Sequence, residues 1–166
     1  MGTDAAWPLH KVISTVLEES TELRGFLGNP IRLSDGGSSD GYTPETPMPR
    51  LAFGDSRSRA WQSATFDGQE HEITLHLWSP PDDADRSRQI AGVIINLLHD
   101  ADLPVPGHAL VDMQFESSET RYLAGTSRGN GQGDGAAMDG EKGNGAAADQ
   151  GACHCLLTFK GLTVSD

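Results

Sequence analysis

The sequence is poor in several features that define common functional classes. Its 166 residues include 12 lysines and arginines against 24 aspartates and glutamates, which gives a formal net charge of -12 at pH 7. Without a basic excess, the chain lacks the charge that drives tight binding to nucleic-acid phosphates. The longest apolar run, Val93 to Leu98, is interrupted by Asn96 and is far shorter than the roughly 20 residues that span a bilayer. We therefore expect neither specific DNA binding nor a membrane span.

Cysteine is equally scarce, and the start of the chain lacks a targeting signal. The two cysteines, Cys153 and Cys155, stand two positions apart, so on a strand they share a face and cannot close an unstrained disulfide. No basic segment followed by an apolar one opens the sequence, as it would in a secretory signal peptide. These features favour a protein that stays in the cytoplasm where it is made.

Apolar residues make up 36% of the chain and are unevenly distributed. Two stretches rich in glycine and polar residues, 34–48 and 125–151, have too few bulky apolar residues to join a core. We expect the first to be a flexible loop and the second a Gly-rich insertion at the tip of a hairpin. The rest is ordinary globular sequence, and the length predicts a single domain over residues 1–166.

The hydrophobic pattern predicts both helices and strands. Apolar residues recur at helical spacing from Leu9 to Leu23 and from Ile90 to Leu98, which indicates two amphipathic helices. Alternation and turn residues predict strands at Ile31 to Leu33, Arg50 to Asp55, Glu70 to Trp78, Ala109 to Glu116 with an extension to Leu123, and Cys153 to Val164. This order predicts an α+β fold, a two-layer domain with a mostly antiparallel sheet of about four to five strands and two helices packed on one face.

Histidines and cysteines raise the hypothesis of a metal site formed by His71, His76, Cys153, His154 and Cys155. The spacing is unfavourable, because on a strand His154 points away from both thiols and no CxxC or HExxH pattern is present. A pair of small buried thiols is the more common outcome. We therefore predict no metal and no cofactor, with a small metal-binding intracellular domain as the alternative.

The other patterns that could indicate catalysis are either incomplete or in the wrong sequence context. Gly131 to Ala136 formally matches GxGxxA, but low-complexity sequence lies on both sides, whereas a dinucleotide-binding loop joins a strand to a helix. The acidic clusters at Glu18 to Glu22 and at Asp82 to Asp85 suit solvated faces and helix starts. No nucleophile with an adjacent base is visible. The sequence predicts a protein that is not an enzyme and has no catalytic residues.

The segment Gly54 to Trp61 is polar but carries two arginines and a tryptophan, and we interpret it as a turn between two strands. These residue types are enriched at interface hot spots, although a tryptophan here could also cap the core. The candidate residues for a contact with another subunit or with a tail tube are Asp55, Arg57, Arg59 and Trp61.

Five segments together resemble the small tail-completion proteins of long-tailed phages, prophages and gene transfer agents. They are PRLAFGD at 49–55, RSRAW at 57–61, HEITLHLWS at 71–79, the helix at 90–99 and the strand at 111–119. The sharpest part is the strand with the pattern H-x-hydrophobic-T-L-H-hydrophobic-W-S, followed by a helix that ends in L-L-H-D. The chain departs from the family in the two glycine-rich stretches.

The resemblance implies a tail terminator, a structural virion protein at the head-tail junction that assembles from the cytoplasm of a bacterial host. Such a subunit forms a hexameric ring on the last ring of tail-tube protein, stops tube polymerisation and meets a head-side connector or stopper protein. DNA would pass through the lumen without specific binding, which suits an acidic protein. Another neck component, a head-tail connector or stopper, is the alternative within the same particle.

Overall fold

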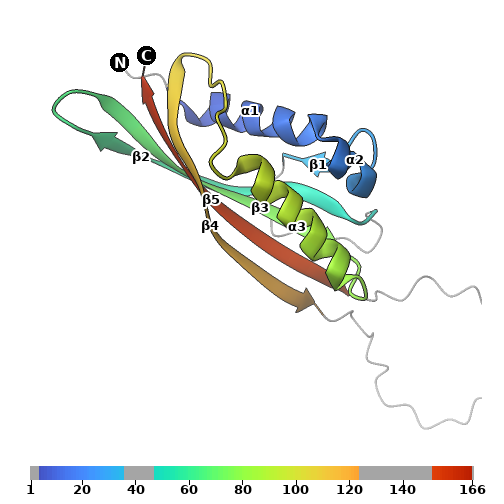
Figure 1. The fold of residues 1–166 in the computed structure, drawn as a ribbon. Helices are drawn as coiled ribbons and strands as arrows, with labels where there is room; N and C mark the ends of the chain where they lie inside the picture. The colour runs from blue at the N-terminus through green and yellow to red at the C-terminus, as the bar shows by residue number, and fades with distance from the viewer. Residues whose placement is uncertain (1–3, 36–46, 124–150, 166) are drawn as a thin grey trace, which may run out of the picture.

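The computed structural model describes residues 4–35, 47–123 and 151–165. Most of the two stretches predicted to be flexible therefore lies outside the described residues. In the described part, three helices and five strands form two layers (Figure 1). Their bounds are α1 Ala6–Glu19, α2 Thr21–Leu27, β1 Leu33–Ser34, β2 Arg50–Gln62, β3 Asp67–Ser79, α3 Ala84–Leu98, β4 His108–Leu123 and β5 Ala152–Ser165. The predicted α+β fold is confirmed.

The five strands form one sheet in the order β1-β2-β3-β5-β4. The short β1 is parallel to β2, and every other neighbouring pair is antiparallel. Strand β5 lies between β3 and β4, so α3 carries the chain over β5 from β3 to the edge of the sheet. The two termini of the described chain meet at the same end of the molecule (Figure 1).

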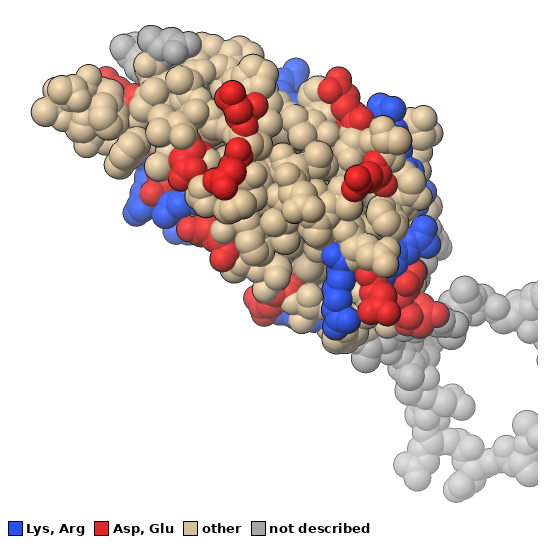
Figure 2. All heavy atoms as spheres, in the orientation of Figure 1, with Lys and Arg blue, Asp and Glu red and all other residues tan. Residues whose placement is uncertain are grey.

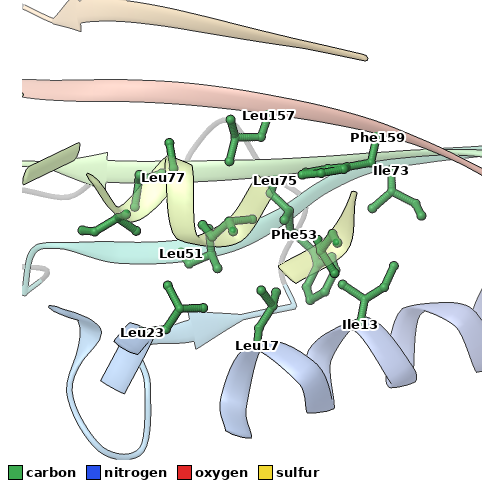
Figure 3. Packing of buried hydrophobic residues seen from close by; sticks show 14 of the residues in the cluster. Ile13, Leu17, Leu23, Leu51, Phe53, Ile73, Leu75, Leu77, Leu157 and Phe159 are labelled. Carbon is green, nitrogen blue, oxygen red and sulfur yellow. The ribbon is translucent and has the colours of Figure 1, made fainter. Parts of the chain in front are cut away.

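The helices cover one face of the sheet, as their apolar stripes require. Helix α1 buries Leu9, Ile13 and Leu17, which recur every four residues, and α3 buries Ile90 and Ile94 in the same way. The strands contribute their alternate positions to the same layer. Figure 3 shows side chains of α1 and α2 pointing at the inward residues of β2, β3 and β5. Phe159, which is fully buried, lies in this core.

The predicted first helix is wrong in one respect, because it is broken into α1 and α2 at Ser20. The backbone of Ser20 is extended, and its hydroxyl accepts a hydrogen bond from the backbone N–H of Leu23 at 3.3 Å. A serine that caps a new helix in this way competes with continuation of the previous one. Gly28, at a φ of 88°, then ends α2, a conformation that favours glycine.

The predicted turn at Gly54 to Trp61 is also wrong. Strand β2 continues to Gln62, with a register shift between Phe53 and Ser56, and the chain reverses only between Ser63 and Phe66. The segment stays extended because it pairs residue by residue with β3. A bulge such as the one after Phe53 adds local twist, which directs the end of the hairpin away from the body.

Candidate interaction surface

Strands β2 and β3 together form a projecting hairpin arm, which we define as residues 55–72. The arm extends past the helices at one end of the sheet (Figure 1). All eight positions of β2 from Asp55 to Gln62 are exposed, since no helix covers this end. On the face shown in Figure 2, few charged side chains lie at its tip. The arm therefore offers a surface that the subunit itself does not use for its core.

Three of the four candidate residues lie in line on the face of the arm turned away from the helices. Arg57, Arg59 and Trp61 alternate along β2 and stand opposite Glu72, Glu70 and Gly68 of β3. The indole of Trp61 rests on Gly68, where an added Cβ would lie 2.9 Å from the ring. It also contacts the ring of Phe66 in the turn, with ring centroids 5.1 Å apart.

The two aromatic rings at the arm tip remain accessible to solvent. Trp61 is 37% exposed and Phe66 is 39% exposed. A pair of large aromatic side chains on a projecting element is unusual for a surface that meets only water, whereas such residues are enriched at interface hot spots. The arm tip is thus a candidate surface for contact with a partner.

Charged residues form a ladder across the four antiparallel strands below the tip. Arg59 pairs with Glu70, and Lys160 of β5 lies 3.3 Å from Glu70 and 3.6 Å from Glu116 of β4. Each of these charges is compensated within the chain. Among the described residues Arg57 has no ion-pair partner, so it is the cation of the arm that a partner could bind.

The fourth candidate, Asp55, is separated from the other three by its position in the bulge. It is exposed and lies near His76; burial lowers the pKa of that imidazole, and the charge of Asp55 opposes this shift only in part. The structure therefore brings Arg57, Arg59 and Trp61 together and places Asp55 beside a different group of side chains.

That group is an aromatic cluster on the same outer face of the sheet, nearer its other end. The ring of His154 stacks on Trp78, with centroids 4.1 Å apart, and on His76 at 4.9 Å. Nδ1 of His76 and Nε2 of His154 are 2.6 Å apart, so one of the two donates a hydrogen bond to the other. The guanidinium of Arg50 lies over the indole of Trp78, 6.0 Å from its centroid.

Both imidazoles of this pair are neutral at pH 7. Burial, followed by the neighbouring His76 and Arg121, lowers the pKa of His154 to about 4, against a smaller opposing effect of Glu119. Burial also lowers the pKa of His76. The two stacked imidazoles are thus uncharged, and they cannot both be protonated without breaking their shared hydrogen bond.

The root of the arm is fixed from the helix side by His71. His71 is buried, and its Nε2 and Nδ1 lie 2.9 Å from Oγ1 of Thr163 and 3.3 Å from Oγ of Ser58. Burial lowers the pKa of His71. Next to it, the backbone N–H of Ala5 donates to Oε1 of Gln69 at 3.0 Å. These contacts join the arm to β5 and to the start of α1.

The residues of the metal hypothesis are divided between the two faces of the sheet. Cys153 and Cys155 are buried under α3, and His154 points to the opposite face, as the spacing indicates. Burial raises the pKa of the Cys155 thiol, which keeps it protonated and unreactive. Within the described ranges, no three potential ligands stand close enough to hold a metal ion.

Two comparisons with known proteins, one with family profiles and one with solved structures, find relatives of this chain. A profile of the family described as tail completion protein gp17 matches residues 11–131. A chain in the solved virion of a native gene transfer agent particle shares the fold, with a TM-score of 0.68 and 15% identity, over 99% of this chain and 100% of that one. No curated protein sequence matches.

The fold and the sequence match define a structural component of a phage tail. The chain belongs to the tail completion protein gp17 family. This is a family of structural virion proteins and not of enzymes, which agrees with the prediction from the sequence. Among the described residues, no helix is long and apolar enough to cross a membrane.

Proposed function

We propose that the protein is a tail terminator. It forms a ring on the end of the tail tube, stops tube polymerisation and joins the tail to the connector or stopper on the head side. The observation that carries the proposal is family membership over residues 11–131, together with the exposed, aromatic-tipped arm. The ring is hexameric, and the assembled protein is located at the head-tail junction.

The arm supplies a contact between subunits or with the tube. A closed ring of identical subunits requires two different surfaces on each subunit, one meeting the other on the next copy. Trp61 and Arg57, with Arg59 between them, form the first of these surfaces, and Asp55 lies at its margin. Burial of the exposed rings of Trp61 and Phe66 on assembly provides the apolar contribution.

DNA that passes through such a ring meets an acidic protein. The net charge of -12 at pH 7 disfavours retention of a polyanion, so the lumen serves as a passage without a specific binding site. The role of the protein in the particle is therefore mechanical.

The proposal is tested by deleting the gene and examining the particles by negative-stain electron microscopy. A terminator is required to stop tube growth, so the deletion should give tails of abnormal length that are not attached to heads, and a plasmid copy should restore normal ones. Normal tails on intact heads in the deletion strain would refute the proposal. Detached tails of uniform normal length would instead assign the protein to a connector or stopper position.

The arm is tested in the same complementation assay. Trp61→Ala should restore roughly tenfold fewer tailed particles than the wild-type gene, as expected for a hot-spot tryptophan. Trp7→Ala is the matched control, because Trp7 is 62% exposed on α1 and lies outside the arm. Equal complementation by both variants would remove the arm from the assembly contacts.

A further inference from the structure

The interior of the protein changes character at the root of the arm. Along β3, Leu75 and Ile73 point into the apolar core, and the next residue on that face towards the arm is His71. Five polar residues are buried in the described ranges, and three of them, His71, His108 and Thr163, lie at this end of the sheet. The arm therefore meets the body through polar side chains, whereas the middle of the sheet meets the helices through apolar ones.

The part of β2 that belongs to the arm has few attachments to the body. Strand β1 pairs with only two residues of β2, Leu51 and Ala52, so beyond them one edge of β2 has no neighbouring strand within the described residues. Every side chain from Asp55 to Gln62 is exposed. Ser58 hydrogen-bonds this strand to a buried side chain, because its Oγ lies 3.3 Å from Nδ1 of His71.

His71 connects that strand to the centre of the sheet. Its Nε2 lies 2.9 Å from Oγ1 of Thr163 on β5, a residue that is 1% exposed. Burial lowers the pKa of His71, so at pH 7 the ring is neutral, with one N–H donor and one acceptor nitrogen. A hydroxyl can donate or accept, so both contacts are satisfied in either tautomer. Ser58, His71 and Thr163 thus form a root contact that joins β2, β3 and β5.

The root contact fixes a direction as well as a position. Apolar burial is non-directional, whereas a hydrogen bond weakens steeply as it bends. Two residues further along β3, Gln69 accepts the hydrogen bond from the backbone of Ala5 and adds a second fixed point. A segment with few buried contacts opens locally more easily than the core, so these contacts decide how firmly the arm is held. They therefore set the direction in which β2 presents Trp61.

We propose that His71 is a positioning residue for assembly, which holds β2 against the body through Ser58 and so aims the aromatic tip of the arm. The inference rests on the proposed role of the arm as an assembly contact. It adds that this contact depends on a buried side chain that does not itself touch the partner. An arm that moves about its root has more conformational freedom to lose on docking, so assembly is weaker without the root contact.

The direct test removes the hydroxyl of Ser58 and measures hydrogen exchange of the purified subunit by mass spectrometry. In Ser58→Ala, the amides of residues 55–62 that pair with β3 should exchange roughly fivefold faster, as expected for the loss of one hydrogen bond, whereas amides of α3 should be unchanged. Ser56→Ala is the matched control. Ser56 is also exposed on β2, and its hydroxyl makes no hydrogen bond among the described residues, so it should exchange as the wild type. In the complementation assay, Ser58→Ala should give roughly fivefold fewer tailed particles than Ser56→Ala.

A second set of variants separates positioning from stability. His71→Phe alone leaves the hydroxyl of Thr163 buried without its partner, so the midpoint of urea unfolding should fall. Adding Thr163→Val removes that hydroxyl and should restore the midpoint, because both partners are then apolar. The double variant should still show fast exchange of the arm and few tailed particles. His71→Gln, whose amide keeps a donor and an acceptor, should recover slow exchange and normal particle numbers.

The two measurements separate the possible failures. Wild-type exchange of the arm in Ser58→Ala and in the double variant would overturn the role of His71 in holding the arm. Fast exchange together with normal numbers of tailed particles would show that assembly does not depend on the root contact. Failure of the proposed function is distinguishable from both, because normal tails in the deletion strain refute the terminator whatever the exchange rates of the arm are.

Discussion

Acidification should weaken the fold through the stacked pair His76 and His154. Nδ1 and Nε2 of the two rings are 2.6 Å apart and share one hydrogen bond. Burial first, and then His76 and Arg121, lowers the pKa of His154 to about 4, while Glu119 opposes the shift. Protonation of His154 in the folded chain would place a charge in a packed aromatic cluster.

The sign follows from the difference between the folded and unfolded pKa values. The unfolded chain binds the proton near the ordinary pKa of 6.5, well above the folded value of about 4. The stability contributed by neutral His154 is therefore complete above pH 6.5 and is lost as the pH falls towards 4. Without solvent screening, lowering the pH from 7 to 5 would reduce the free energy of unfolding by about 1.8 kcal/mol. Because His154 is only partly buried, solvent screening reduces the expected loss to about 1 kcal/mol.

The assay is urea denaturation of the purified protein at the two pH values. His154→Gln removes the titrating group and retains an amide able to bond with His76, so its free energy of unfolding should lose about 1 kcal/mol less than that of the wild-type chain on acidification. His71 and His76, whose pKa values are also lowered, contribute with the same sign in both proteins. Equal pH dependence of the variant and the wild-type protein would refute the reasoning.

Three further predictions concern stability. Phe159→Ala should cost about 3–5 kcal/mol in urea denaturation, because Phe159 is fully buried and its removal leaves a cavity; a loss under about 1 kcal/mol would contradict the core described here. Gly54→Ala should cost about 1–3 kcal/mol and reduce the effect of pH, because the new Cβ would overlap the imidazole of His76; an unchanged protein would show that the ring moves freely. Replacement of residues 125–150 by a short turn should leave stability unchanged or raise it by up to about 2 kcal/mol, since closure entropy varies only slowly with the length of a connection. A loss of several kcal/mol would show that this segment packs.

Periodic hydrophobic residues made the main elements predictable. Alternation at Ile73, Leu75 and Leu77 predicts a strand with one buried face, and all three are buried in β3. The same holds for the helical spacing of Ile90 and Ile94. The position of β5 between β3 and β4 was not predictable, because the choice among antiparallel partners depends on contacts between residues far apart in the chain.

The β2 part of the arm was missed because it is exposed at every position. From Asp55 to Gln62 no apolar residue alternates with a polar one, so the segment has the composition of a turn. Its extended form depends on β3, which supplies Glu70 for Arg59 and the bare backbone of Gly68 for Trp61. A glycine paired with a tryptophan is visible only after the register of the two strands is known.

The correction from turn to strand changes what the candidate residues can do. In a turn, Arg57, Arg59 and Trp61 would point in different directions, whereas on β2 they form one line along the arm. The arm is held by cross-strand pairing and, at its root, by the contacts of His71 with β5. Side chains ordered before docking lose less conformational freedom on binding. The free subunit therefore keeps Trp61 partly exposed to water. In the proposed ring, burial of that side chain in a neighbouring subunit contributes to assembly with little cost of ordering the arm.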